Sequence, residues 1–187
     1  SLNFQITDKC FLCTYHPVTL SNMSSETQVL NLLQALDDYK DYHIIFTYSN
    51  SDTNSQIIIK RIQEYVDRNV GRCMFIPSLG QRRYFSALKY MTAVIGNSSS
   101  GIIEVPSFGI PTLDIGDRQK GRIAADSVIH CSYSTEEIKD GLKKVVAYGN
   151  KTINNPYYKE GTSDAILNVI KTYPLVNLVQ KHFYDIQ

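Results

Sequence analysis

The stretch AVIGNSSSGIIE, residues 93–104, places an apolar run, a small polar loop and the start of a helix in immediate succession. The apolar run at residues 93–95 is short, as expected for a strand that is buried on both faces. Glycines at positions 96 and 101 bracket the loop, where they permit a tight turn and a close approach of the backbone. This stretch therefore predicts one strand–loop–helix unit of an α/β fold.

The same alternation continues on both sides of this unit. Strands are predicted at residues 11–14, 43–48, 72–77, 93–95, 111–115 and 127–130. Helices are predicted at residues 25–40, 56–69, 81–91, 102–108, 135–148, 164–173 and 175–184. The first of these helices begins with Ser25 and Gln28 in the spacing of a capping box. Such repeated alternation predicts a Rossmann-like, doubly wound parallel sheet with helices on both faces.

The composition fits one ordinary globular domain, with 187 residues of which 43% are hydrophobic and 20% charged. Lys and Arg number 19 against 18 Asp and Glu, so the chain has no basic surplus for general binding to nucleic acid or an acidic membrane. No apolar run approaches the roughly 20 residues that span a bilayer, and the polar start shows no signal-peptide pattern. We therefore expect a cytoplasmic protein with no nucleic-acid and no membrane partner.

Four cysteines occur, at positions 10, 13, 73 and 131, and the first two form a C-x-x-C pattern. That pattern is compatible with redox or zinc chemistry. Phe11 and Leu12 between them indicate a strand, however, in which the two thiols point to opposite faces, and no further ligands follow at the spacing of a zinc site. We interpret the cysteines as buried apolar side chains, and we expect neither a metal ion nor a cofactor.

Small, polar and cationic residues follow the predicted strands directly. In a doubly wound sheet, ligands bind beyond the carboxyl ends of the strands, so these residues are the candidates for a site. They are His16 after the first strand, Asn50 after the second, Ser98 and Ser99 after the fourth, Glu104 in the helix that follows, and Arg118 after the fifth. The sequence therefore predicts that a ligand binds at this edge of the sheet.

The loop with Ser98 and Ser99 is suited to phosphate, because a helix start offers free backbone N–H groups and the serines add hydroxyl donors. It matches neither the Walker A pattern nor G-x-G-x-x-G, and a serine-rich cap and turn is the alternative. Glu104 lies about one turn into the helix, where a carboxylate can accept hydrogen bonds from the hydroxyls of a ribose. Its alternative role is to complement the helix dipole.

Arg118 belongs to a loop with three cations, GDRQKGR at residues 116–122. An arginine can hold a diphosphate with two parallel hydrogen bonds, whereas the alternative is a solvated basic loop. His16 can donate to a phosphate or assist a proton transfer, and Asn50 can contact the ligand or simply form a turn. The remaining histidines are interpreted as structural: His43, His130 and His182.

Several of these segments closely resemble the UDP-N-acetylglucosamine 2-epimerases: GNSSSGIIEV at 96–105, FGIPT at 108–112 and GDRQKGR at 116–122. YHPVT at 15–19 and YSNSD at 48–52 match as well, so the resemblance runs in order from about residue 10 to residue 130. The GDRQ-x-GR ending is similar to that of the hydrolysing members, which begin sialic acid synthesis and release UDP and N-acetylmannosamine.

The resemblance implies that residues 1–187 form a single UDP-binding Rossmann-like domain, with 161–187 as closing C-terminal helices. This domain would be the C-terminal half of a glycosyltransferase-B-like two-domain fold, with the N-terminal catalytic domain absent. Ser98 and Ser99 would then bind the diphosphate and Glu104 the ribose hydroxyls. His16, Asn50 and Arg118 would contact the phosphate or nearby substrate groups, and His16 would also support catalysis.

The reaction implied by the resemblance eliminates UDP across C1 and C2 of the sugar and then adds water to the 2-acetamidoglucal intermediate. Carboxylates of the N-terminal domain would remove the C2 proton, so the isolated chain is expected to be inactive without that domain as its partner. The resemblance also implies homo-oligomer formation by the whole enzyme. The alternatives are a non-hydrolysing epimerase, an epimerase for a bacillosamine derivative, a UDP-sugar-binding module without catalysis, and a glycosyltransferase-like domain.

Overall fold

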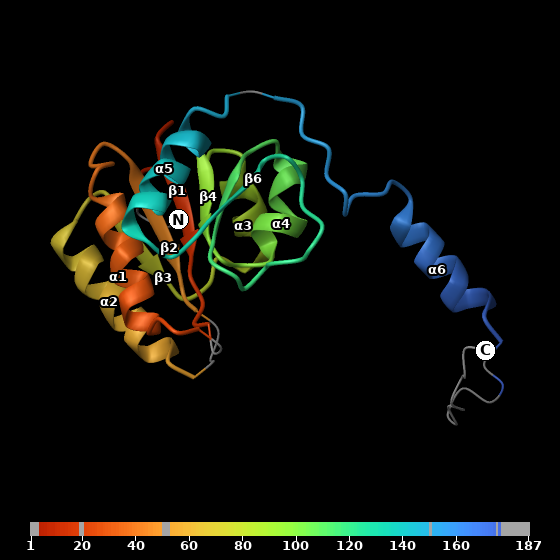
Figure 1. Cartoon of the computed structure of the whole chain (residues 1–187). Helices are drawn as coiled ribbons and strands as arrows, with labels where there is room; N and C mark the ends of the chain where they lie inside the picture. Colours follow the sequence, from red (N-terminus) through yellow and green to blue (C-terminus); the bar gives the residue numbers. More distant parts are fainter. Residues whose placement is uncertain (1–3, 19–20, 50–52, 150, 175, 177–187) are drawn as a thin grey trace. The chain divides into compact units, whose positions relative to one another are not determined.

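The computed structural model describes residues 4–18, 21–49, 53–149, 151–174 and 176, and a parallel sheet forms the centre of residues 1–157 (Figure 1). The strands are β1 (Cys10–Thr14), β2 (His43–Thr47), β3 (Cys73–Ile76), β4 (Ala93–Gly96), β5 (Thr112–Ile115) and β6 (Val128–Cys131). Their order is β3-β2-β1-β4-β5-β6, and every pairing is parallel. The direction of winding reverses between β1 and β4, which is where doubly wound sheets bind ligands.

Helices cover both faces of this sheet. One face carries α1 (Ser25–Leu36), α2 (Ser55–Arg68) and α5 (Thr135–Val146), and Figure 1 shows α1 beside α2. The other face carries α3 (Gly80–Leu88), α4 (Ser100–Ile103) and the 3₁₀ helix η1 (Val105–Phe108). The Rossmann-like, doubly wound prediction is therefore confirmed.

Alternate residues of the central strands pack into different cores. Phe11 and Ile44 lie in the core under α1, α2 and α5, whereas Leu12 and Ile45 lie in the core under α3 and η1. All four side chains are fully buried. This two-sided burial accounts for the continuous apolar runs from which the strands were predicted.

The predicted capping box at the start of α1 is wrong by one residue. Ser24 is the N-cap, and its hydroxyl accepts from Thr27 N at 3.1 Å. Gln28 is buried instead, and its Oε1 accepts from the Tyr15 hydroxyl at 3.0 Å. The Gln28 side chain therefore binds Tyr15 in the loop after β1 and is not part of a capping box, and Ser24 caps the helix.

Two predicted helices have other limits in the structure. The helix predicted at 25–40 ends at Leu36, since Tyr39 and Tyr42 pack on Phe11 instead, with the Tyr42 ring stacked at 4.4 Å between centroids. The helix predicted at 102–108 is two short pieces, α4 and η1, that meet at Glu104. Pro106 lies in the first turn of η1, where its missing N–H is tolerated.

Residues 158–187 form a second compact unit. It contains α6 (Thr162–Thr172), in agreement with the helix predicted at 164–173. Ile166, Leu167, Val169 and Ile170 of this helix are all exposed. The helix predicted at 175–184 lies almost entirely outside the described residues. Among the helices that the structure describes, none is long and apolar enough to cross a membrane.

Candidate functional site

A cavity of about 590 Å³ opens at the carboxyl ends of the central strands. Each of the loops after β1, β2, β3 and β4 contributes to its wall. The lining residues are Thr14, His16, Thr47, Tyr48, Ser49, Pro77, Ser78, Leu79, Gly80, Gln81, Tyr84, Phe85, Ser98, Ser100 and Glu104. Three of the predicted site residues, His16, Ser98 and Glu104, therefore share one cavity, at the point where the winding of the sheet reverses.

His16 is held at this cavity by Asn97. The His16 N–H donates to Asn97 Oδ1 at 2.7 Å, and Asn97 Nδ2 donates to the His16 carbonyl at 2.8 Å. Asn97 is fully buried, and His16 is 5% exposed. The loops after β1 and β4 are thus joined by a pair of hydrogen bonds, and the backbone of His16 has a fixed position beside the serine loop.

The serine loop runs from β4 into α4. Gly101 N donates to the Ser98 carbonyl at 3.1 Å, and Ile102 N and Ile103 N donate to the Ser99 carbonyl at 3.0 Å. Those N–H groups are used within the loop, so a phosphate would be bound by the serine hydroxyls and by the N–H groups of residues 98–100. Ser98 lines the cavity, whereas Ser99 is absent from its lining. Because α4 has only four residues, its dipole is smaller than that of the longer helix predicted at residues 102–108.

Glu104 closes α4 and faces the cavity together with Tyr84 of α3. The Tyr84 hydroxyl forms a hydrogen bond with the hydroxyl of Ser100. Burial raises the pKa of Tyr84 to about 12, and the Ser100 hydrogen bond opposes this rise. The phenol is therefore neutral at physiological pH, and Tyr84 offers an aromatic ring and a hydroxyl beside the carboxylate.

Arg118 lies against the serine loop from the other side. Its Nη1 donates to the Asn97 carbonyl at 3.1 Å, and Gln119 Nε2 donates to the same oxygen at 2.8 Å. The other cations of this loop point outward: Lys120 is 79% exposed and pairs with Asp117 at 3.5 Å, and Arg122 is exposed. A solvated basic loop thus describes Lys120 and Arg122, whereas Arg118 contacts the serine loop, although it does not line the cavity.

Comparison with known proteins decides the family. The model for the UDP-N-acetylglucosamine 2-epimerase family matches residues 2–171. The chain belongs to this epimerase family. It is 37% identical over 184 residues to the polysialic acid biosynthesis protein P7 of Escherichia coli, covering 94% of this chain and 46% of that protein. It is also 39% identical over 129 residues to the hydrolysing GDP/UDP-N,N'-diacetylbacillosamine 2-epimerase of Campylobacter jejuni, covering 69% of this chain and 34% of that enzyme.

Solved epimerase structures share the fold. The UDP-N-acetylglucosamine 2-epimerase of Neisseria meningitidis, bound to UDP-N-acetylglucosamine, aligns with a TM-score of 0.64 at 19% identity and covers 90% of this chain. The enzyme of Methanocaldococcus jannaschii aligns with a TM-score of 0.67 at 15% identity. The alignments cover 45% and 46% of those two chains, so this epimerase-family chain spans about half the length of its relatives.

Three residues at the candidate site were not predicted from the sequence: Tyr84, Asn97 and Gln119. Asn97 and Gln119 stood inside the quoted motifs, but only Ser98, Ser99, Glu104 and Arg118 were selected from those two motifs. Asn50, in contrast, lies outside the described residues, although its neighbours Tyr48 and Ser49 line the cavity. A polar residue at the end of a buried strand is the signal that could have identified Asn97.

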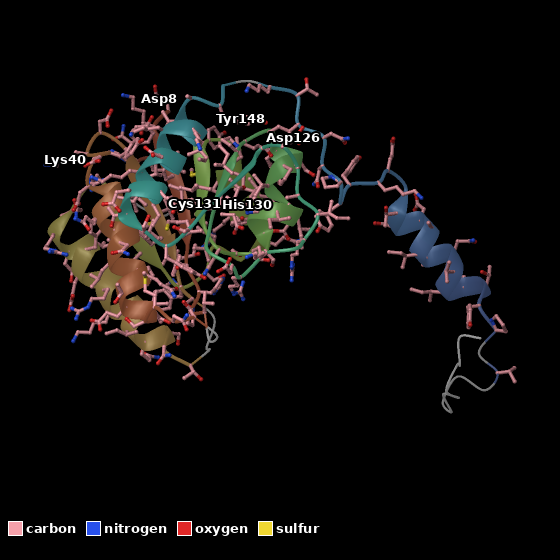
Figure 2. The ribbon with its side chains drawn as sticks, in the orientation of Figure 1. Asp8, Lys40, Asp126, His130, Cys131 and Tyr148 are labelled. Carbon is pink, nitrogen blue, oxygen red and sulfur yellow. The ribbon has the colours of Figure 1, made fainter. Side chains whose placement is uncertain are left out.

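Two further histidines of this epimerase-family chain, His43 and His130, are absent from the lining of the cavity. His130 Nδ1 is 2.9 Å from Asp114 Oδ2, and Figure 2 labels His130 beside Cys131 at the end of β6. Burial raises the pKa of Asp114, and the His130 hydrogen bond opposes this rise. His43 contacts the Gln5 carbonyl at 2.7 Å, and His182 lies outside the described residues. These contacts agree with a structural role for His43 and His130.

The cysteines are free thiols on strands of the sheet, with Cys10 in one core and Cys13 in the other. This opposite orientation is the one that the strand interpretation predicted. Within the described part of the chain, no group of three or more His, Cys, Asp and Glu side chains could hold a metal ion. Burial raises the pKa of every one of these thiols, to about 11 for Cys73 and about 12 for Cys10 and Cys131.

These raised pKa values predict unreactive thiols. Only the thiolate attacks a thiol reagent, so the native protein at pH 8 should react about a hundredfold more slowly than free cysteine, or slower still. Labelling with a chromogenic disulfide, followed over time, measures this rate, and the same protein in denaturant is the control. The partly exposed Cys131 is the critical position, because a single fast thiol there would contradict the prediction.

Proposed function

We propose that this chain is the UDP-binding half of a hydrolysing UDP-N-acetylglucosamine 2-epimerase. The observation that carries the proposal is that His16, Ser98 and Glu104 meet in one cavity at the reversal point of the sheet, with Arg118 attached to the same serine loop. Relatives named as hydrolysing epimerases, at 39% and 33% identity, support the reaction type.

In this proposal the nucleotide lies across the carboxyl ends of β1 and β4. Glu104 accepts hydrogen bonds from the ribose hydroxyls, and the ring of Tyr84 borders the nucleoside end of the cavity. Ser98, Ser99 and Arg118 hold the diphosphate, and His16 and Asn50 contact the phosphate or nearby substrate groups. A guanidinium with five donors suits this task, because it can spare one for Asn97 and still contact two phosphate oxygens.

The proposed reaction begins with removal of the C2 proton of the sugar by a base from the other half of the enzyme. The C–H electron pair forms the C1–C2 double bond, and the C1–oxygen bond breaks so that its electron pair leaves with UDP. Water then adds its hydroxyl at C1 and a proton at C2, which gives N-acetylmannosamine. The residues of this chain stabilise the charge on the departing diphosphate, and His16 assists as a donor.

Residues 158–187 have a role in the same proposal. Residues 161–187 would close the enzyme against its other half, since α6 has exposed apolar residues that a partner surface could cover. Homo-oligomer formation would depend on the whole enzyme. The relative of Escherichia coli is named for polysialic acid biosynthesis, and this supports a place in sialic acid synthesis.

A second candidate substrate is UDP-N,N'-diacetylbacillosamine. The relatives of Campylobacter jejuni and Legionella pneumophila, at 39% and 33% identity, are named for that sugar. Both candidates contain the same UDP group, so the site described above serves either. With the other half of the enzyme joined to this chain, parallel assays of the two nucleotide sugars would separate them.

Calorimetric titration of this chain with UDP, and with AMP as control, tests the proposal. We expect UDP to bind and AMP to bind at least about tenfold more weakly, because AMP has one phosphate where Ser98, Ser99 and Arg118 are proposed to hold two. Equal affinity for both nucleotides, or no heat with UDP, would reject a self-sufficient UDP site. A positive result would justify adding the other half and measuring the release of N-acetylmannosamine.

A further inference from the structure

Three loops of the candidate site are connected through a single residue, Asn97. We propose that Asn97 and Gln119 are positioning residues, an amide clip that sets the spacing between His16, the serine loop and Arg118. This inference rests on the proposed UDP site and adds residues that act on the diphosphate only through others. The two side chains are 0% and 2% exposed, so neither is available as a surface contact.

One side of the amide clip controls the loop after β1. Regular pairing of β1 with β4 ends at Thr14 and Gly96, and Asn97 N still donates to the Thr14 carbonyl at 3.2 Å. Beyond that point the Asn97 side chain takes over the hydrogen bonding that a paired strand would supply. It accepts from the His16 N–H at 2.7 Å and donates to the His16 carbonyl at 2.8 Å. An amide is the group that can accept from an N–H and donate to a carbonyl at once.

The other side of the amide clip controls the loop after β5. The Asn97 carbonyl accepts from Arg118 Nη1 at 3.1 Å and from Gln119 Nε2 at 2.8 Å. A carbonyl oxygen has two lone pairs, and both are used here. Gln119 therefore acts as a second tether of the loop that carries Arg118, and it keeps the guanidinium against the serine loop.

The clip acts on the phosphate end of the site and leaves the nucleoside end unaffected. Glu104 is held within α4, where its N–H donates to the Ser100 carbonyl at 3.0 Å. Tyr84 is held by α3 and by its contact with Ser100. Loss of the clip should therefore weaken contacts to the diphosphate while contacts to ribose and base persist. Comparison of UDP with uridine distinguishes these two ends.

The first test is Asn97→Ala, titrated with UDP and with uridine. We expect the Kd for UDP to rise about tenfold and the Kd for uridine to change less than about twofold. Asn31→Ala is the matched control, since Asn31 Nδ2 also joins two distant segments by donating to a backbone carbonyl, that of Tyr133, at 2.9 Å. This control should leave both affinities within about twofold. An equal loss for UDP and uridine in Asn97→Ala, or no loss, would overturn the proposal.

Gln119→Ala provides a second test that remains valid if Asn97→Ala does not fold. It removes one tether and leaves the Arg118 contact, so we expect a rise of about threefold in the Kd for UDP alone. An unchanged Kd would contradict the role of Gln119 in the clip.

A measurement without ligand separates this inference from the proposed function. Amide hydrogen exchange at His16 should be slow in the wild type, fast in Asn97→Ala and slow in Gln119→Ala, because only the first substitution removes the acceptor of the His16 N–H. Rapid exchange at His16 in the wild type would refute the clip itself. If the wild type binds neither UDP nor uridine while His16 is protected as expected, the proposed function fails and the clip geometry stands.

Discussion

Gly96→Ala is expected to lower the free energy of unfolding by about 3–5 kcal/mol. Two costs add: the backbone has a positive φ that alanine adopts with strain, and the new Cβ overlaps with a neighbouring strand. Gly96 has a φ of 132°, and a Cβ there would lie 1.9 Å from the Thr14 carbonyl oxygen. That oxygen belongs to the backbone of the neighbouring strand and cannot rotate away. Since a domain of this size is stable by only about 5–15 kcal/mol, this loss is a large fraction of its total stability. Urea denaturation followed by circular dichroism measures the change.

Gly71→Ala is the matched control for this substitution. Gly71 has a φ of 89°, and no described atom lies within 4 Å of a Cβ built there. It therefore tests the cost of the backbone conformation alone, about 1–2 kcal/mol. If both variants lost the same stability, the close approach of β4 to β1 would not be the cause.

Arg118→Ala is expected to weaken UDP binding about ten- to hundredfold, since a set of charge-assisted hydrogen bonds is worth ~1.5–3 kcal/mol. The double variant Ser98→Ala with Ser99→Ala should show a loss in the same range, because it removes the hydroxyl donors that are proposed to hold the diphosphate together with Arg118. Arg118→Lys should recover little of the affinity, since an ammonium keeps the charge but lacks the planar pair of donors. Calorimetric titration of each variant with UDP gives the Kd.

Arg122→Ala is the control for the cationic loop as a whole. Arg122 carries the same charge in the same loop but is exposed to solvent. Its loss should change the affinity for UDP by less than about threefold, as expected for a screened surface charge. Comparable losses in the Arg118 and Arg122 variants would favour general electrostatic attraction over a defined contact. Unchanged affinity in both the Arg118 and the serine variants would reject the site as drawn.

Much of the fold was accessible from the sequence because its strands are buried on both faces. A run such as Ile44-Ile45-Phe46 is apolar at every position, as expected for a strand that is buried on both faces, and a polar loop follows it. Once the strands were identified, the rule for doubly wound sheets predicted which loops meet. That rule predicted that His16, Ser98 and Glu104 lie at one edge of the sheet, and in the structure all three line the same cavity.

The residues that escaped prediction depend on contacts between distant segments. Asn97 and His16 are 81 residues apart in the chain, and no local pattern links them. Tyr84 resembled any aromatic residue on an amphipathic helix until its contact with Ser100 was visible. The error at the α1 cap has a local origin, because Ser24 and Ser25 are equally suited to cap and the choice depends on Gln28 being bound to Tyr15.

The strand order β3-β2-β1-β4-β5-β6 has a consequence for biosynthesis. As the chain leaves the ribosome, β1, β2 and β3 can pair among themselves, but one side of β1 stays an open edge until β4 has been made. An open edge of this kind invites pairing with other chains. The loops after β1 and β4 come together only at that later moment, and contacts between distant segments form slowly. Pairing of β4 with the open edge of β1 and assembly of the candidate cavity are therefore one event in time, so a nascent chain that has formed the cavity has already covered the β1 edge.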